Sequence, residues 1–144
     1  MDDIDKRIIK LLNNNSRVSI TQISKEVNVS RPSVENRIER LISEEIIKSF
    51  TIDTSLDKIG YEISFYVLIS DINIKNEVFR EILINNKFIV EVNCVTGKAN
   101  YVVKAATPTM DKMNELLCEL RKYAQIETLL ILHNLVEERL LELI

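Results

Sequence analysis

The spacing of apolar residues changes near Gly60 from a helical repeat to the alternation of β-strands, and this change limits the fold more than any other feature. Before Gly60, apolar residues recur every three or four positions, as on one face of an α-helix. After it, short alternating runs are interspersed with helical repeats. We therefore predict an α+β protein with a helical domain at residues 1–60 and a mixed domain at residues 61–144.

The helical domain is predicted to begin with two helices and a tight turn. The first helix covers Asp2 to Asn13, and the second covers Ile20 to Val27. Ser19 and Gln22 have the spacing of a capping box, in which each side chain satisfies a backbone N–H at the helix start. Asn28 follows the second helix. Because asparagine tolerates a positive φ angle better than most residues with a side chain, Asn28 suits a sharp turn that ends a helix.

A third helix is predicted from Ser30, a good N-cap residue, to about Glu45. Its apolar residues form one arc, and its polar residues form the opposite arc. This arrangement is typical of a helix-turn-helix, whose last helix enters the major groove of DNA. Arginine and asparagine suit that task, since they form paired hydrogen bonds with guanine and adenine. The predicted DNA-binding residues are Ser30, Arg31, Ser33, Asn36, Arg37 and Arg40.

Two other interpretations of the third helix are open. Its arginines can belong to a generic solvent-exposed face, paired with Glu35 and Glu39. Alternatively, the helix-turn-helix is a docking surface in a small-molecule-sensing or protein-interaction module that does not bind DNA. The capping box, the Asn28 turn and the apolar arc occur in register with one another, and this combination favours DNA binding.

The residues after the third helix predict a wing and then a second fold. Ile46 to Ile52 is predicted to be a short strand, so the first domain is expected to be a winged helix-turn-helix. Further on, strands and helices are expected in the order β-α-β-β-α-β, which is the ferredoxin-like arrangement. The strands are expected at Tyr61–Ser70, Phe88–Val95, Asn100–Ala106 and Ile126–His133, and the helices at Glu77–Asn85 and after Pro108. A last helix is predicted to place Val136, Leu140, Leu143 and Ile144 on one face.

Composition and charge exclude several classes of protein. The net charge is −3 overall and zero over residues 1–60, so DNA binding must rest on a local patch. The start of the chain is too acidic for a signal peptide, and no apolar run reaches the roughly 18 residues of a membrane span. We therefore expect a cytoplasmic protein without a membrane partner. Cys94 and Cys118 lack a paired spacing and are expected in the core. With a single histidine, His133, we expect no metal site, cofactor or catalytic site.

The chain resembles the Lrp/AsnC family of transcription regulators, also called feast/famine proteins. The segment "DIDKRIIKLLNNNSRVSITQISKEVNVSRPSVENRIERLISEEIIKSFT" is similar to the family's N-terminal domain, and "VTGKANYVVKA", Val95 to Ala105, is similar to its second signature. The resemblance extends from Asp2 to about His133. It implies a DNA-binding domain, a ferredoxin-like effector domain, dimers that are often assembled into octamers, palindromic DNA as partner and an amino acid or related small molecule as effector.

The same resemblance implies an effector loop at Thr96 and Gly97, to which we add Lys98 and Asn100. Where the family has an acidic stretch, this chain has Gly-Lys-Ala-Asn, and Asn28 and Glu45 replace glycines that are common in the family. The loop thus lacks a carboxylate for an amino-acid ammonium, and Lys98 favours a ligand with a free carboxylate or another anion. The alternative is that Lys98 is a solvated hairpin residue.

Overall fold

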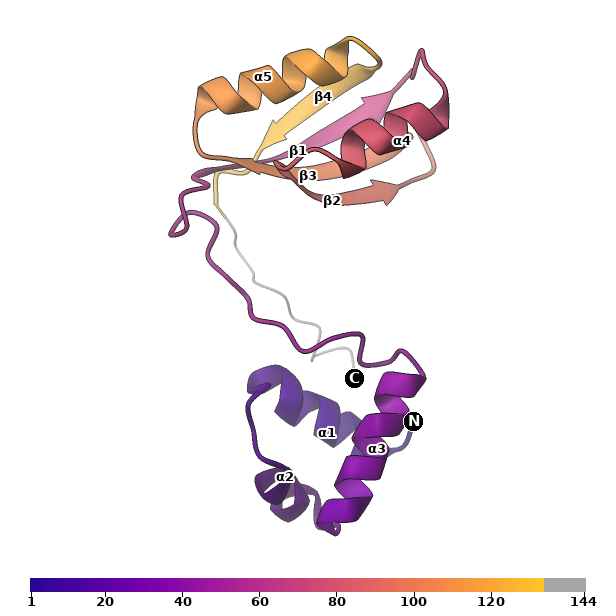
Figure 1. Cartoon of the computed structure of the whole chain (residues 1–144), viewed down its shortest axis with the longest axis vertical. Coiled ribbons are helices and arrows are strands. Elements are labelled where there is room, and N and C mark those ends of the chain that lie inside the picture. The colour runs from indigo at the N-terminus through magenta and orange to yellow at the C-terminus, as the bar shows by residue number, and fades with distance from the viewer. Residues whose placement is uncertain (134–144) are drawn as a thin grey trace. The chain divides into compact units, whose positions relative to one another are not determined.

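The computed structural model describes residues 1–133 (Figure 1). Contacts between Cα atoms divide these residues into two compact units, residues 1–53 and residues 54–133. The predicted tail helix with Val136, Leu140, Leu143 and Ile144 lies outside the described residues. Within residues 1–133, no helix combines the length and the apolar character that crossing a bilayer requires.

The N-terminal unit consists of the three predicted helices, α1 (Asp3–Asn14), α2 (Ile20–Val27) and α3 (Arg31–Ser43). They pack around a core of Ile8, Ile23, Val27, Val34 and Ile38. At the start of α2, the Ser19 hydroxyl accepts a hydrogen bond from the Gln22 N–H at 3.2 Å. The reciprocal bond of the predicted capping box, from the Ser19 N–H to the Gln22 side chain, is absent from the described residues. A complete capping box forms instead at α1, where Asp2 and Asp5 each accept a bond from the other's backbone N–H at 2.9 Å.

The turn between α2 and α3 has the backbone predicted for Asn28. This residue is left-handed, with φ 56° and ψ 43°. The turn is closed by a bond from the Val29 N–H to the Ser24 carbonyl at 3.2 Å. The left-handed residue reverses the chain over a short distance and so allows α3 to start within a few residues of the end of α2.

A second left-handed residue ends α3. Glu45 has φ 55°. The Ile46 N–H donates to the Leu41 carbonyl at 2.9 Å, and the Glu45 N–H donates to the Ile42 carbonyl at 3.0 Å. These two bonds define a Schellman motif, which satisfies carbonyls that would otherwise lack partners at the helix end.

The predicted wing strand at Ile46–Ile52 does not form in this chain. Residues 48–55 adopt no regular structure, and Phe50 and Ile52 are 52% and 79% exposed. The alternating apolar pattern is that of a strand, but among the described residues no neighbouring strand supplies the ladder hydrogen bonds that a strand needs.

The second unit has the predicted β-α-β-β-α-β order. Its elements are β1 (Ile63–Ser70), α4 (Asn76–Ile84), β2 (Ile89–Cys94), β3 (Tyr101–Thr107), α5 (Met110–Arg121) and β4 (Gln125–Leu130). The strands form an antiparallel sheet in the order β2-β3-β1-β4. β1 lies between β3 and β4, so both of its backbone edges are hydrogen-bonded within the sheet.

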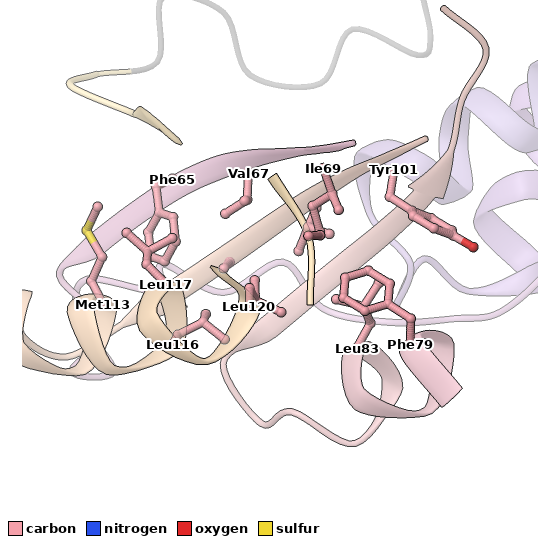
Figure 2. Close-up of a cluster of buried hydrophobic side chains, with 13 residues drawn as sticks. Phe65, Val67, Ile69, Phe79, Leu83, Tyr101, Met113, Leu116, Leu117 and Leu120 are labelled. Carbon is pink, nitrogen blue, oxygen red and sulfur yellow. The ribbon is translucent and has the colours of Figure 1, made fainter. Parts of the chain in front are cut away.

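Both helices of this unit pack on the same face of the sheet (Figure 2). Phe65, Val67 and Ile69 of β1 point toward them and are fully buried, whereas the alternate residues of β1 point to the opposite face. The helices contribute Phe79 and Leu83 from α4, and Met113, Leu116, Leu117 and Leu120 from α5. Neither α4 nor α5 covers the opposite face.

Several side chains differ from their predicted positions. A register shift between Ile89 and Glu91 of β2 interrupts the predicted alternation, because an extra residue turns Val90 out to 53% exposure. Met110, at the start of α5, is 48% exposed. Both cysteines, Cys94 and Cys118, are free and exposed, so the prediction that they lie in the core is wrong.

Candidate nucleic-acid interface

The N-terminal half of α3 presents polar side chains to solvent. Arg31 and Asn36 are exposed, and Ser33 is half-buried. Ser30 occupies the N-cap position and is exposed, but its hydroxyl makes no capping bond, contrary to its predicted role. Because the first N–H groups of a helix lack intrahelical acceptors, this end of α3 also offers backbone donors and a positive dipole end to an anion.

The other two predicted arginines lie further along α3 and bind carboxylates of α1. Arg37 Nη1 lies 2.7 Å from Asp5 Oδ1 and 2.7 Å from Asp2 Oδ2. Arg40 Nη2 lies 2.6 Å from Asp5 Oδ2, and its Nε lies 3.9 Å from Glu44 Oε1. The structure therefore separates the six predicted residues into an N-terminal group that faces solvent and a pair of arginines that joins α3 to α1.

Asp5 is the centre of this pair. Its side chain is only 1% exposed, while those of Arg37 and Arg40 are 23% and 45% exposed. Burial by itself raises the pKa of Asp5, but the Asp2 N–H, the Arg37 hydrogen bond and the charge of Arg40 together hold that pKa below its usual value. The carboxylate is thus ionised inside the domain, with both oxygens bonded.

Asp2 completes the cluster from the N-cap of α1. The Asp5 N–H, followed by Arg37, lowers the pKa of the Asp2 carboxyl to about 2. In turn, hydrogen bonds from Arg37 to Asp2 and Asp5 raise the pKa of Arg37. At neutral pH the four side chains therefore carry two negative and two positive charges in contact, and we call Asp2, Asp5, Arg37 and Arg40 the charge cluster.

The sequence interpretation missed the acidic half of the charge cluster. The alternative partners considered for the arginines, Glu35 and Glu39, make no ion pair with them in the described part of the chain. One signal could have identified Asp5. It lies three residues before Ile8 and seven before Leu12, and so on the apolar side of α1. A carboxylate on an apolar helix face needs a cationic partner from another element.

The predicted effector loop joins β2 to β3. Gly97 has φ 125°, a conformation that residues with a side chain rarely adopt. The loop is held to the sheet by the Asn100 N–H, which donates to the Ile69 carbonyl at 2.7 Å, and by the Val95 N–H, which donates to the Asn100 carbonyl at 3.0 Å. Thr96 is exposed.

Lys98, one of the four predicted effector residues, lines a hollow of the surface. The hollow has a volume of about 200 Å³ and is lined by Lys98 and Ala99 of the loop, Leu68 and Ser70 of β1, and Gln125, Ile126 and Glu127 at the start of β4. Its lining therefore combines a cationic residue, an acidic residue and apolar residues. Sequence reasoning missed Glu127, because only the strand order brings β4 beside β1 and the loop.

Both halves of the chain match families of known proteins. Residues 1–42 match the AsnC-type helix-turn-helix domain, and residues 69–141 match the Lrp/AsnC ligand binding domain. The chain belongs to the Lrp/AsnC family of transcriptional regulators. Among its relatives in the family, the HTH-type transcriptional regulator FL11 of Pyrococcus furiosus is 33% identical over 120 residues, which are 81% of this chain and 78% of that protein.

Solved Lrp/AsnC structures have the same fold. Bacillus subtilis LrpC, at 27% identity, superposes with a TM-score of 0.90 over 96% of this chain and 99% of its own. The transcriptional regulator NMB0573 of Neisseria meningitidis, solved as a complex with L-Met, superposes with a TM-score of 0.87 over 96% of this chain and 94% of its own. The latter is 16% identical and shows a common fold only.

Proposed function

We propose that this Lrp/AsnC regulator binds palindromic double-stranded DNA as a dimer, or an assembly of dimers, through the N-terminal half of α3. The observation that carries this proposal is the polar group at the start of α3, formed by exposed Arg31 and Asn36 and half-buried Ser33, next to a helix end that attracts phosphate. Arg31 has no carboxylate partner among the described residues, so its charge is available to DNA.

Self-association is supported by the face of the sheet that α4 and α5 leave free. Cα pairing places Tyr66 beside Lys104 and Leu129, and Leu68 beside Val102 and Glu127. Tyr66 is 36% and Leu129 is 45% exposed. A sheet buries at least one face against another layer, and apolar residues on its second face mark an interaction surface. A two-fold dimer would present two α3 helices to half-sites about 10 base pairs apart, or a multiple of that spacing.

The hollow beside Lys98 supports binding of an effector that carries both charges. Lys98 supplies a cation for a carboxylate, as the sequence suggested, and Glu127 supplies an anion for an ammonium. The ligand class that we propose is therefore a free amino acid or a related zwitterion. Blocking either its amino or its carboxyl group should weaken the thermal shift that the ligand produces, and Glu127→Gln should abolish the discrimination against amino-blocked ligands.

Selection of genomic fragments with the purified chain tests the DNA-binding proposal. We expect an enriched palindrome. On that site, Asn36→Ala should cost about 1–3 kcal/mol if Asn36 makes a bidentate bond to adenine. Glu35→Ala, an exposed neighbour on α3, is the matched control and should bind at least as well as the parent. Failure to enrich any fragment at low salt would refute the proposed function.

A further inference from the structure

Arg37 and Arg40 are charged groups on the candidate DNA-binding helix, yet their charges are already matched. Asp5 bonds one arginine with each of its carboxylate oxygens, and Asp2 makes a further contact with Arg37. All three bonds are between 2.6 and 2.7 Å, at or just below the short end of the range for charge-assisted N–H···O hydrogen bonds. The charge cluster therefore adds no net positive charge to the surface that DNA would meet.

Burial of Asp5 makes the release of these arginines unfavourable. DNA phosphates could attract Arg37 and Arg40 only if both left a carboxylate that is 1% exposed. Removing the partner of a buried charge is strongly destabilising, because the remaining charge is cut off from water and has no compensation. An arginine at the surface of a basic protein has no such restraint. The geometry thus holds both arginines on α1 even when phosphates are close.

We propose that Asp5 is a specificity-determining positioning residue, which withholds Arg37 and Arg40 from DNA phosphates and so keeps sequence-independent binding weak. This inference rests on the proposed function. Phosphate contacts carry no sequence information, and they supply nearly all of non-specific affinity. Because Asp5 keeps two arginines out of these phosphate contacts, discrimination between DNA sequences is left to the N-terminal half of α3. Arg31 and Asn36 are exposed there, and Ser33 is half-buried.

The salt dependence of DNA binding measures this role directly. Each phosphate neutralised by a cationic side chain adds about 0.9 to the negative slope of log affinity against log salt concentration. Asp5→Asn keeps the shape of the side chain but removes its charge. Arg37 then retains Asp2, whereas Arg40 retains only Glu44 at 3.9 Å. The freed Arg40 should therefore steepen the slope on random-sequence duplex by about 0.9 per subunit.

The experiment compares Asp5→Asn with Asp3→Asn, which removes the same charge from an exposed position of α1. Binding of a random-sequence duplex and of the selected fragment is titrated between roughly 50 and 200 mM salt. We expect Asp5→Asn alone to steepen the random-duplex slope and to reduce the ratio of specific to non-specific affinity several-fold. Equal slopes in the two folded variants would overturn the inference. If the parent chain binds neither duplex, the proposed function itself fails, which is a distinct result.

A second variant decides the matter even if Asp5→Asn does not fold. Arg40→Gln leaves Asp5 paired with Arg37 and removes the more exposed of the two arginines. If Asp5 withholds Arg40 from phosphates, this substitution leaves the slope on random duplex unchanged. A slope reduced by about 0.9 per subunit would show that Arg40 contacts phosphate in the parent chain and would contradict the inference.

Discussion

Replacing Glu45 with glycine should stabilise the N-terminal unit, because Glu45 holds a left-handed backbone conformation at the end of α3. Its φ of 55° is disfavoured for any residue with a Cβ atom, at about 1–2 kcal/mol. Glycine removes this strain. However, glycine also has more conformational entropy in the unfolded chain, which lowers the stability of the fold by about 0.5–1 kcal/mol. The net gain from the backbone is therefore about 0.5–1 kcal/mol.

Charge contributes separately at this position. Glu45 lies next to the negative end of the α3 dipole, where a carboxylate is unfavourable by about 0.3–1 kcal/mol. Its side chain is exposed and makes no hydrogen bond or ion pair within the described residues, so its removal sacrifices no contact. Glu45→Gln removes the charge and keeps the strained backbone, and Glu45→Ala does the same with a shorter side chain.

Urea and thermal unfolding followed by far-ultraviolet circular dichroism measure the series. We expect the free energy of unfolding to be highest for Glu45→Gly. It should be nearly equal for Glu45→Gln and Glu45→Ala, and both should be slightly more stable than the parent. For a unit of this size, each kcal/mol corresponds to roughly 4–8 °C in melting temperature. The dependence of the unfolding free energy on urea should stay constant. If glycine is no more stable than glutamine at position 45, backbone strain there is not what limits stability.

Three further outcomes follow from the same structure. Lowering the pH from about 4 toward 2 should destabilise the N-terminal unit, because the carboxyls of Asp2 and Asp5 have a lower pKa in the folded chain than in the unfolded chain. Their ionised forms stabilise the fold above the unfolded pKa, and this stabilisation is lost as they are protonated. Acid titration of Asp2→Asn should show a shallower loss of stability. Asn28→Ala should cost about 1 kcal/mol in chemical unfolding, whereas Asn28→Gly should not, since φ is 56°. Gly97→Ala should destabilise the sheet unit by about 1–3 kcal/mol in thermal unfolding through backbone strain alone, because no atom lies within 4 Å of the added Cβ; an unchanged midpoint would contradict this.

Local signals explain why most of the fold could be predicted from the sequence. The helix boundaries and the β-α-β-β-α-β order rest on periodicity, on caps such as Ser19 and on turn residues such as Asn28, all of which act over a few positions. The strand predicted at Ile46–Ile52 failed because an alternating pattern gives a strand only where a neighbouring strand can pair with it.

The candidate site was less predictable, because its chemistry depends on contacts between elements. The sequence identified Arg37 and Arg40 as cations on the polar arc of α3, which is correct for their position. Their partner Asp5 lies more than thirty residues earlier, and only the packing of α1 on α3 brings it within bonding distance. Similarly, Glu127 joins Lys98 through strand order, which no local pattern encodes.

The position of β1 at the centre of the sheet affects how the chain folds as it is synthesised. The described core of the helical unit joins residues of α1, α2 and α3, which all lie within the first 43 positions, and such local topologies form fast. β1, by contrast, pairs with β4, so that Phe65 cannot meet Leu130 until some 65 further residues have been synthesised and have left the ribosome. At about 5–20 residues per second, the apolar β1 strand waits several seconds with an unpaired edge. During synthesis, therefore, the DNA-binding half is folded first, and the sheet half passes through the state that is most prone to aggregation or to capture by a chaperone.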